Sequence, residues 1–199
     1  MPRPITFDPD QVLQTAARVF YEQGFANTGI ADIVARAGVS RHSIYTRWGD
    51  KEGLLAACLP VYRAFVFQTV LAPLEASPGH QGVYDFLDSL AGGCQASAMP
   101  ACLLVQSLIE HPSGSGPSGL AKQHFDGIAA RVSQSVANSQ SLGTLQADFD
   151  GQGYGQLVSL TLQGLNVSRR GGLDLEQTRA ALAMLKNLLC SQELPCASH

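Results

Sequence analysis

Apolar residues recur at helical spacing through the first fifty residues, in three short segments. The first segment follows Asp8 and Pro9, an N-cap residue and a proline at the first helical position, and ends at Gly24. The second can be capped by Asn27 or Thr28, after which isoleucine, valine and alanine form an apolar stripe. The pattern therefore predicts two amphipathic helices before residue 38.

A third short helix follows almost at once. Gly38 ends the second helix, and Ser40, another N-cap residue, opens a helix that runs to about Arg47. Residues 37–39 alone connect the two segments. Two short helices joined by so tight a turn indicate a helix-turn-helix.

This third helix has two different sides. Ile44 and Trp48 lie four residues apart and pack inward with Val39 in the expected structure. The other side is polar and aromatic, and carries Arg41, His42, Tyr45 and Thr46. A guanidinium pairs with guanine or phosphate, imidazole and hydroxyl groups bond base edges, and a phenol suits a phosphate oxygen. The pattern is typical of a recognition helix, against the alternative of a solvated face on a small helical bundle.

The DNA-binding site extends beyond this helix. Asp50 caps a fourth helix and places Lys51 and the first amides of that helix near the DNA backbone. The full set of expected DNA contacts is Thr28, Ser40, Arg41, His42, Tyr45, Thr46, Arg47 and Lys51.

The remaining chain reads as helices separated by Gly, Ser and Pro. The fourth helix should run from Asp50 into the low seventies, with a kink at Pro60. Further helices are expected at about 83–99, 101–111, 120–140, 152–170 and 174–190. The sequence therefore predicts an all-α protein of about nine helices. Its domains are a three-helix helix-turn-helix over residues 1–52 and a larger helical bundle over residues 53–199.

Composition fits this scheme. The chain has 199 residues and a net charge of −3, but residues 1–63 hold seven Lys/Arg and six Asp/Glu, or +1, whereas residues 64–199 hold six and ten, or −4. No apolar run reaches the roughly 20 residues of a membrane span, and no signal peptide is apparent, so a cytoplasmic location without membrane contact is expected. The five cysteines form no CxxC pair, so neither a disulfide framework, a metal site nor a cofactor is expected.

A family resemblance rests on the order of these motifs. Residues 20–24 and 28–40, then Ile44-Tyr45-Thr46-Arg47-Trp48-Gly49-Asp50-Lys51-Glu52 with Leu54-Leu55, resemble the DNA-binding domain of TetR-family regulators. Trp48 stands where that pattern usually has Phe, and Arg47 where it often has His. The resemblance covers about a quarter of the chain. It implies a homodimer that binds double-stranded operator DNA and responds to a small-molecule effector.

The last two predicted helices are rich in leucine. The resemblance implies that both pair with their copies in a partner subunit, through Leu157, Leu160, Leu165, Leu182, Leu185 and Leu189. Packing inside one subunit is the alternative. A symmetric dimer would place two recognition helices about 34 to 36 Å apart, so a palindromic operator is expected.

The sequence says least about which residues sense the effector. Cys102 begins a predicted helix, where the helix dipole would lower the pKa of its thiol and raise its reactivity. This segment, with 143–148 and 160–167, also resembles the TetR branch that includes NemR-type electrophile-responsive repressors. The alternatives are that Cys102 is a buried small hydrophobe, and that an apolar ligand binds noncovalently. The expected sensor or pocket residues are Cys102, Phe65, Phe86, Leu90, Gln106, Phe125 and Gln163.

These patterns favour a DNA-binding repressor that an effector releases from its operator, and not an enzyme. The expected mechanism is a shift of the central helices that the fourth helix transmits to the recognition helices. A cysteine-dependent enzyme would need a base near Cys102, for which no local signature exists. A helical interaction module would leave the polar face of residues 41–46 unexplained.

Overall fold

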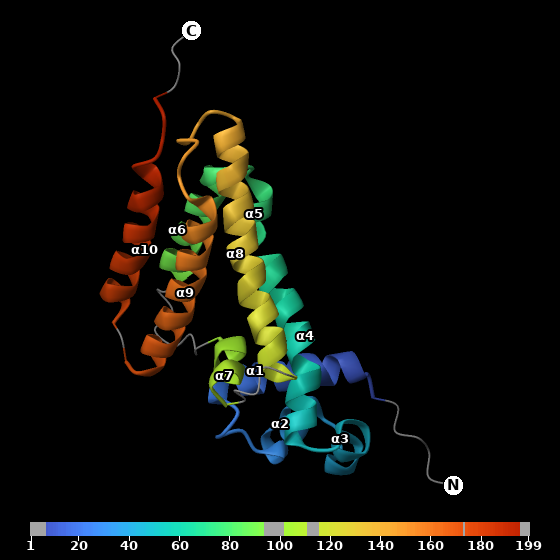
Figure 1. Cartoon of the computed structure of the whole chain (residues 1–199). Coiled ribbons are helices and arrows are strands. Elements are labelled where there is room, and N and C mark those ends of the chain that lie inside the picture. Colours follow the sequence, from blue (N-terminus) through green and yellow to red (C-terminus); the bar gives the residue numbers. More distant parts are fainter. Residues whose placement is uncertain (1–6, 94–101, 111–115, 173, 196–199) are drawn as a thin grey trace. The chain divides into compact units, whose positions relative to one another are not determined.

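The structure, a computed structural model, describes residues 7–93, 102–110, 116–172 and 174–195. Within these ranges it holds ten α-helices and one isolated β-bridge, between Leu145 and Glu193, which confirms the all-α prediction (Figure 1). The helices are α1 (Pro9–Gln23), α2 (Ile30–Ala37), α3 (Arg41–Trp48), α4 (Lys51–Thr69), α5 (Ala72–Ala76), α6 (His80–Gly93), α7 (Leu103–Glu110), α8 (Pro117–Ser141), α9 (Gly151–Arg170) and α10 (Leu175–Cys190).

The described residues fall into two compact units. The first takes in those of ranges 1–65 and 100–121, and the second those of 66–99 and 122–199. This geometric division lies after Phe65 and assigns α7 to the first unit. It differs from the expected functional boundary at residue 52, which stays a prediction.

Local chemistry sets the ends of α1. The Asp8 carboxylate accepts a hydrogen bond from the Asp10 N–H at 3.0 Å, and Pro9 fills the first helical position, where no donor is needed. Gly24 ends the helix with φ of 80° and donates its N–H to Phe20 O at 2.8 Å. Phe20 is fully buried and anchors the core of the first unit. Both predicted ends of α1 are confirmed.

The fourth helix is shorter than expected. α4 continues through Pro60 but ends at Thr69, and a separate short helix, α5, follows. The Val70 and Leu71 N–H groups both donate to Val66 O, which closes the last turn of α4. Pro73 then occupies the first turn of α5, where a residue without an N–H is tolerated. One continuous helix into the low seventies was therefore a wrong prediction.

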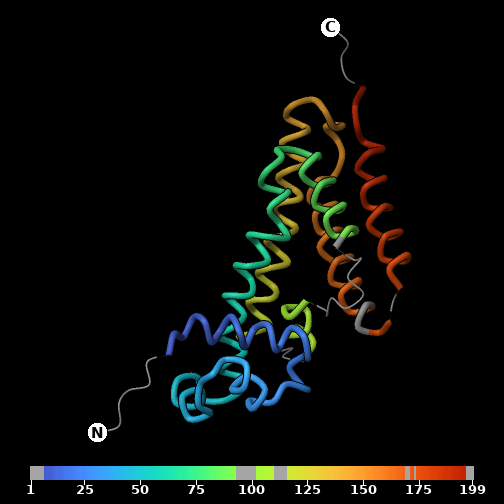
Figure 2. The backbone as a smooth tube through the Cα atoms, turned by 180° about the vertical axis from the view of Figure 1, so that it is seen from behind, coloured from blue at the N-terminus to red at the C-terminus, as the bar shows by residue number. Residues whose placement is uncertain are grey.

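The second unit is built on close helix contacts. α10 packs against α6 and α9, and α9 runs beside both α8 and α10 (Figures 1 and 2). The Tyr154 hydroxyl of α9 donates to Leu185 O of α10 at 2.9 Å, and Ser159 Oγ donates to Phe125 O of α8 at 2.9 Å. A Cβ on Gly155 would lie 2.4 Å from Ala129 O, so only glycine permits this approach of α9 to α8.

The segment after α10 is held to the loop between α8 and α9. Leu194 N–H donates to Thr144 O at 3.1 Å, and Gln146 N–H donates to Gln192 O at 2.9 Å. Between these bonds the Glu193 carboxylate accepts from the Tyr84 hydroxyl. These bonds connect the end of the described chain to α6 and to the loop after α8.

None of the helices in the described ranges is long and apolar enough to cross a membrane. Among the same residues, no three His, Cys, Asp or Glu side chains gather in a group that would hold a metal ion.

Candidate DNA-binding site

The turn between α2 and α3 is set by two residues. Gly38 adopts the left-handed conformation, with φ of 66° and ψ of 24°, and donates its N–H to Val34 O at 3.0 Å. Ser40 Oγ accepts the Ser43 N–H at 3.0 Å and caps α3. Val39, between them, is buried. This geometry confirms the predicted helix-turn-helix.

Helix α3 presents the two faces that were predicted. Ile44 is completely buried and holds the helix against the unit. The opposite face is exposed and comprises Ser40, Arg41, His42, Tyr45, Thr46 and Arg47. Tyr45 is 43 % exposed, so its ring and its hydroxyl are both accessible on this face. This side combines two guanidinium groups, an imidazole and three hydroxyls on one short helix.

Two of these side chains are paired along α3. His42 Nε2 lies 3.5 Å from Thr46 Oγ1, an i,i+4 contact that orders both side chains on the exposed face. If the imidazole is neutral, its second nitrogen remains able to donate or accept toward a base edge. This face therefore presents hydrogen-bonding groups of the kinds that can read base edges.

Thr28 does not belong to this exposed set. It is 2 % exposed, and its hydroxyl donates to Gly24 O at 2.7 Å. The cap of α2 is Gly29, whose N–H donates to the Asp32 carboxylate at 2.8 Å, and not Asn27 or Thr28 as predicted. A capping box closed by Asp32 replaces the expected side-chain cap. Thr28 therefore stabilises the loop from inside and offers DNA no hydroxyl.

Lys51 also differs from its expected setting. Asp50 caps α4 as predicted, by accepting the Gly53 N–H at 2.7 Å. The Lys51 ammonium, however, lies 4.4 Å from the centroid of the Phe25 ring and 3.4 Å from Ala26 O. The lysine is thus engaged by the loop between α1 and α2.

The predicted motifs omit an aromatic contact at the end of α3. The Phe7 and Trp48 rings lie 6.0 Å apart, and the Arg47 guanidinium lies 5.8 Å from the Trp48 ring. Trp48, the departure from the usual pattern, therefore provides a larger ring for both neighbours. The only sequence signal for this contact was the unusual tryptophan itself.

Cys102 lies just before α7 and not inside a helix. Helix α7 begins at Leu103, two residues later than predicted, and Cys102 O accepts the Gln106 N–H at 3.1 Å. The Tyr62 hydroxyl donates to Cys102 Sγ at 3.7 Å, and the Tyr62 ring lies 5.8 Å from that of Tyr21. The thiol therefore lies against Tyr62, a residue of its own unit.

The electrostatics of this thiol oppose the expectation of a reactive thiolate. Desolvation by burial raises the pKa of Cys102 above its ordinary value, although hydrogen bonds from the Val105 and Leu104 backbone and from Tyr62 act in the opposite direction. Burial outweighs the helix N-terminus here, so the predicted lowering of the pKa was wrong. Burial likewise raises the pKa of Cys58 to about 12. Cys94 and Cys196 lie outside the described residues.

The other expected pocket residues are spread over both units. Phe65 and Gln106 belong to the first unit, whereas Phe86, Leu90, Phe125 and Gln163 belong to the second. Phe86, Gln106 and Phe125 are buried, and Phe65 is 60 % exposed. Leu90 and Gln163 have intermediate exposure. A common pocket for these residues stays a prediction.

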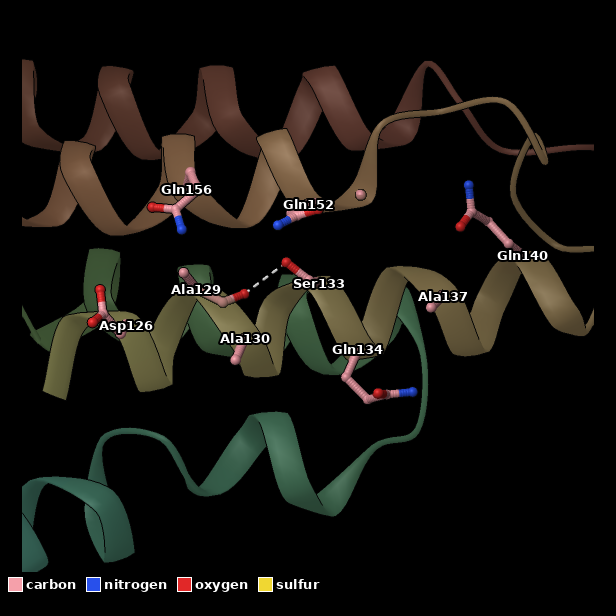
Figure 3. Close-up of a pocket in the computed structure, with 10 residues that line it drawn as sticks. Asp126, Ala129, Ala130, Ser133, Gln134, Ala137, Gln140, Gln152 and Gln156 are labelled. Carbon is pink, nitrogen blue, oxygen red and sulfur yellow. Dashed lines mark hydrogen bonds between the residues drawn. The ribbon is translucent and has the colours of Figure 1, made fainter. Parts of the chain in front are cut away.

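A groove that was not predicted lies between α8 and α9 (Figure 3). Its volume is ≈ 480 Å³, and its lining is rich in glutamine and alanine, with Asp126 and Ser133. Ser133 Oγ is turned to Ala129 O of its own helix, at 2.8 Å (Figure 3). Effector pockets typically have apolar and aromatic walls, so this groove does not match the expected pocket.

The leucines of α9 and α10 separate into inner and outer sets. Leu182, Leu185 and Leu189 are 5 % exposed or less, so core packing, the alternative interpretation, describes them. Leu165 has intermediate exposure. The exposed apolar residues of the two helices form what we call the α9–α10 face: Leu157, Leu160, Val167, Met184 and Leu188. The predicted dimer interface omitted Met184 and Leu188. Their i,i+4 spacing places both on one side of α10 and could have indicated them from the sequence.

The geometry of α1–α3 defines a helix-turn-helix protein, and comparison with known proteins specifies the family. Residues 12–58 match the model of the bacterial regulatory proteins of the tetR family. Over 179 residues, 88 % of this chain and 85 % of the relative, the chain is 24 % identical to the transcriptional repressor ComR of Escherichia coli K12. It is 43 % identical over 49 residues to the regulator TtgR of Pseudomonas putida, which spans 25 % of this chain and 23 % of that protein.

Solved structures share the whole fold. The reduced form of E. coli NemR superposes with a TM-score of 0.78 at 20 % identity, over 95 % of this chain and 98 % of NemR. A cysteine mutant of CifR, solved with 26-bp operator DNA, gives 0.77 at 23 % identity over 93 % and 98 %. Residues 12–58 therefore form a DNA-binding domain of the tetR-family type, and the whole chain has the fold of these solved regulators. Members of this family regulate transcription and are not enzymes.

Proposed function

We propose that this protein is a transcriptional repressor that binds palindromic operator DNA as a homodimer through the exposed face of α3. The observation that carries the proposal is the face itself: Arg41, His42, Tyr45, Thr46 and Arg47 are all exposed, while Ile44 behind them is fully buried. Such a helix is held rigidly by its inner side and is free to enter a major groove. The names of two relatives, the E. coli repressors ComR and BdcR, support repression.

Each exposed group has a role in this proposal. The Arg41 guanidinium pairs with guanine or with a phosphate, and His42 with Thr46 reads base edges. The Tyr45 hydroxyl and the Arg47 guanidinium suit phosphate oxygens, and the exposed N-terminus of α3 favours anions. CifR, of the same fold, was solved with operator DNA, which supports operator binding by this fold.

Dimerisation follows from the α9–α10 face. Its most exposed members, Leu160 and Met184, are 62 % and 69 % exposed on neighbouring helices. Exposed apolar side chains grouped on two neighbouring helices are typical of an interaction surface, and a second copy of the same face would cover them by a two-fold axis. The paired recognition helices then meet a palindromic site.

The effector in this proposal is a small molecule that binds noncovalently. The raised pKa of Cys102 leaves little thiolate for reaction with an electrophile, so noncovalent binding is favoured over thiol modification. α4 carries the resulting displacement from the effector-binding bundle to α3. Reciprocal linkage requires operator DNA to weaken effector binding by the same factor.

The test is binding to DNA upstream of the protein's own and neighbouring genes, measured by fluorescence anisotropy at fixed salt. The double variant Arg41→Ala with Tyr45→Ala should lose about thirtyfold or more in affinity, because each of the two contacts contributes roughly 1 to 3 kcal/mol. The matched control is Lys122→Ala, which removes one positive charge from an exposed pair with Asp126 on α8. Equal loss in the control, or no loss in the double variant, would refute the assignment of α3.

A further inference from the structure

The last two residues of α3 form a cation–π pair. The Cζ atom of the Arg47 guanidinium lies 5.8 Å from the centroid of the Trp48 ring. A cation within about 6 Å of a ring is attracted by the ring quadrupole, and an indole attracts it more strongly than a phenyl or phenol ring does. A guanidinium also stacks on aromatic faces more readily than an ammonium does. The pair therefore combines the cation and the ring that suit this contact best.

The indole of this pair is held by its surroundings. The Phe7 ring, just before α1, lies 6.0 Å from it at an interplanar angle of 49°. The Trp48 carbonyl oxygen accepts the Asp50 N–H at 3.0 Å. Gly49, with φ of 81°, ends α3 by donating its N–H to Tyr45 O at 2.9 Å. The backbone that carries the indole is thus fixed by the turn after α3, and a second aromatic ring lies against it.

The Arg47 guanidinium is exposed and available to an external acceptor. No Asp or Glu of the described ranges forms an ion pair with it, whereas Arg36 of α2 is paired with Glu22. Arg47 lies in the last turn of α3, where the partial negative charge of the helix end favours a cation. A guanidinium has five N–H donors, so one ring contact leaves donors for a bidentate acceptor such as a phosphate.

We propose that Trp48 is a positioning residue that holds the Arg47 guanidinium at the end of the recognition helix, ready for a phosphate of the operator backbone. An arginine side chain loses rotamer freedom when it makes such a contact. Holding it in place before DNA arrives lowers this cost and so strengthens binding. Trp48 acts through Arg47 and is not itself a DNA ligand. The inference deepens the proposed function and rests on it.

A double-mutant cycle in operator affinity, measured at several salt concentrations, tests this role. Trp48→Phe keeps an aromatic ring but weakens the cation–π contact, so it should weaken operator binding by about twofold per protomer without changing the salt dependence. Arg47→Gln removes the charge and should reduce the slope of log K against log [salt] by about 0.9 per protomer. In the Arg47→Gln background, Trp48→Phe should have no further effect on affinity.

The control cycle combines Trp48→Phe with Arg41→Gln. Arg41 is the first residue of α3, seven positions before Trp48, so these two effects should be additive. A merely structural role for Trp48 predicts additive effects in both cycles. Additivity with Arg47→Gln, or an unchanged affinity in Trp48→Phe, would overturn the proposal.

Fluorescence tests the contact in the free protein, because Trp48 is the single tryptophan of the chain. A nearby charge shifts indole emission, so Arg47→Gln should change the emission spectrum and Arg41→Gln should not. Identical spectra for wild type and Arg47→Gln would overturn the contact. If wild type binds no operator, the proposed function and the positioning role fail together. If wild type binds and the cycle of Trp48 with Arg47 is additive, only the positioning role fails.

Discussion

Replacing Leu160 by serine tests the proposed dimer directly. Leu160 is 62 % exposed and belongs to the α9–α10 face. Fully burying a leucine side chain is worth roughly 1.5 to 3 kcal/mol, so covering the exposed part in a dimer is worth roughly 1 to 2 kcal/mol. A two-fold axis uses each residue twice, which raises the loss on substitution to about 2 to 4 kcal/mol per dimer. The dimer dissociation constant should therefore rise at least about thirtyfold.

Sedimentation equilibrium over a range of protein concentrations measures this constant. The matched control is Leu142→Ser, because Leu142 is 71 % exposed but follows α8 and lies outside the α9–α10 face. Leu142→Ser should dimerise as wild type does, and circular dichroism should show equal helix content in all three proteins. An unchanged constant for Leu160→Ser, or equal weakening in the control, would refute the assignment of this face.

Three further predictions follow from burial and backbone conformation. Burial favours the neutral thiol of Cys102, so the contribution of this thiol to stability is complete below the ordinary pKa of 9.0 and falls as pH rises above it. Iodoacetamide at pH 8 should therefore modify the exposed Cys190 at least tenfold faster than Cys102, as measured by mass spectrometry. Equal rates in the folded protein would contradict this prediction. Gly38→Ala should cost about 1 to 2 kcal/mol in chemical denaturation, because its φ of 66° disfavours a Cβ although no atom lies within 4 Å; a neutral effect would refute the left-handed turn. Gly155→Ala should lower the free energy of unfolding by about 1 to 3 kcal/mol, because the added Cβ would lie 2.4 Å from a backbone oxygen of α8. The control Gly92→Ala, with open space around the added Cβ, should change stability little. The reverse order would show that α8 and α9 are not in close contact.

The helix-turn-helix could be predicted from the sequence because its signals are local. Asp8, Ser40 and Asp50 each cap the helix that follows them, and Gly24 and Gly38 end helices with positive φ. Each of these contacts spans four residues or fewer, so the pattern along the chain contains all the necessary information.

What the sequence could not predict depends on residues that are distant in the chain. The contact of Lys51 with Ala26 joins residues 25 positions apart, and the hydrogen bond from Tyr62 to the Cys102 thiol joins residues 40 positions apart. Burial then reversed the expected direction of the thiol pKa shift. Periodicity alone also does not show which side of α10 faces the core, so buried Leu182 was assigned to the interface while exposed Met184 was omitted.

The most direct test of the central claim is selection of binding sites from random double-stranded DNA, followed by footprinting of the enriched sequence. The account predicts a palindrome protected over two half-sites, with centres one helical turn of DNA, about 34 to 36 Å, or a multiple of it apart, and no enrichment by the variant Arg41→Ala with Tyr45→Ala. Failure of the wild-type protein to enrich any sequence, or equal enrichment by the variant, would contradict the claim that α3 reads operator DNA.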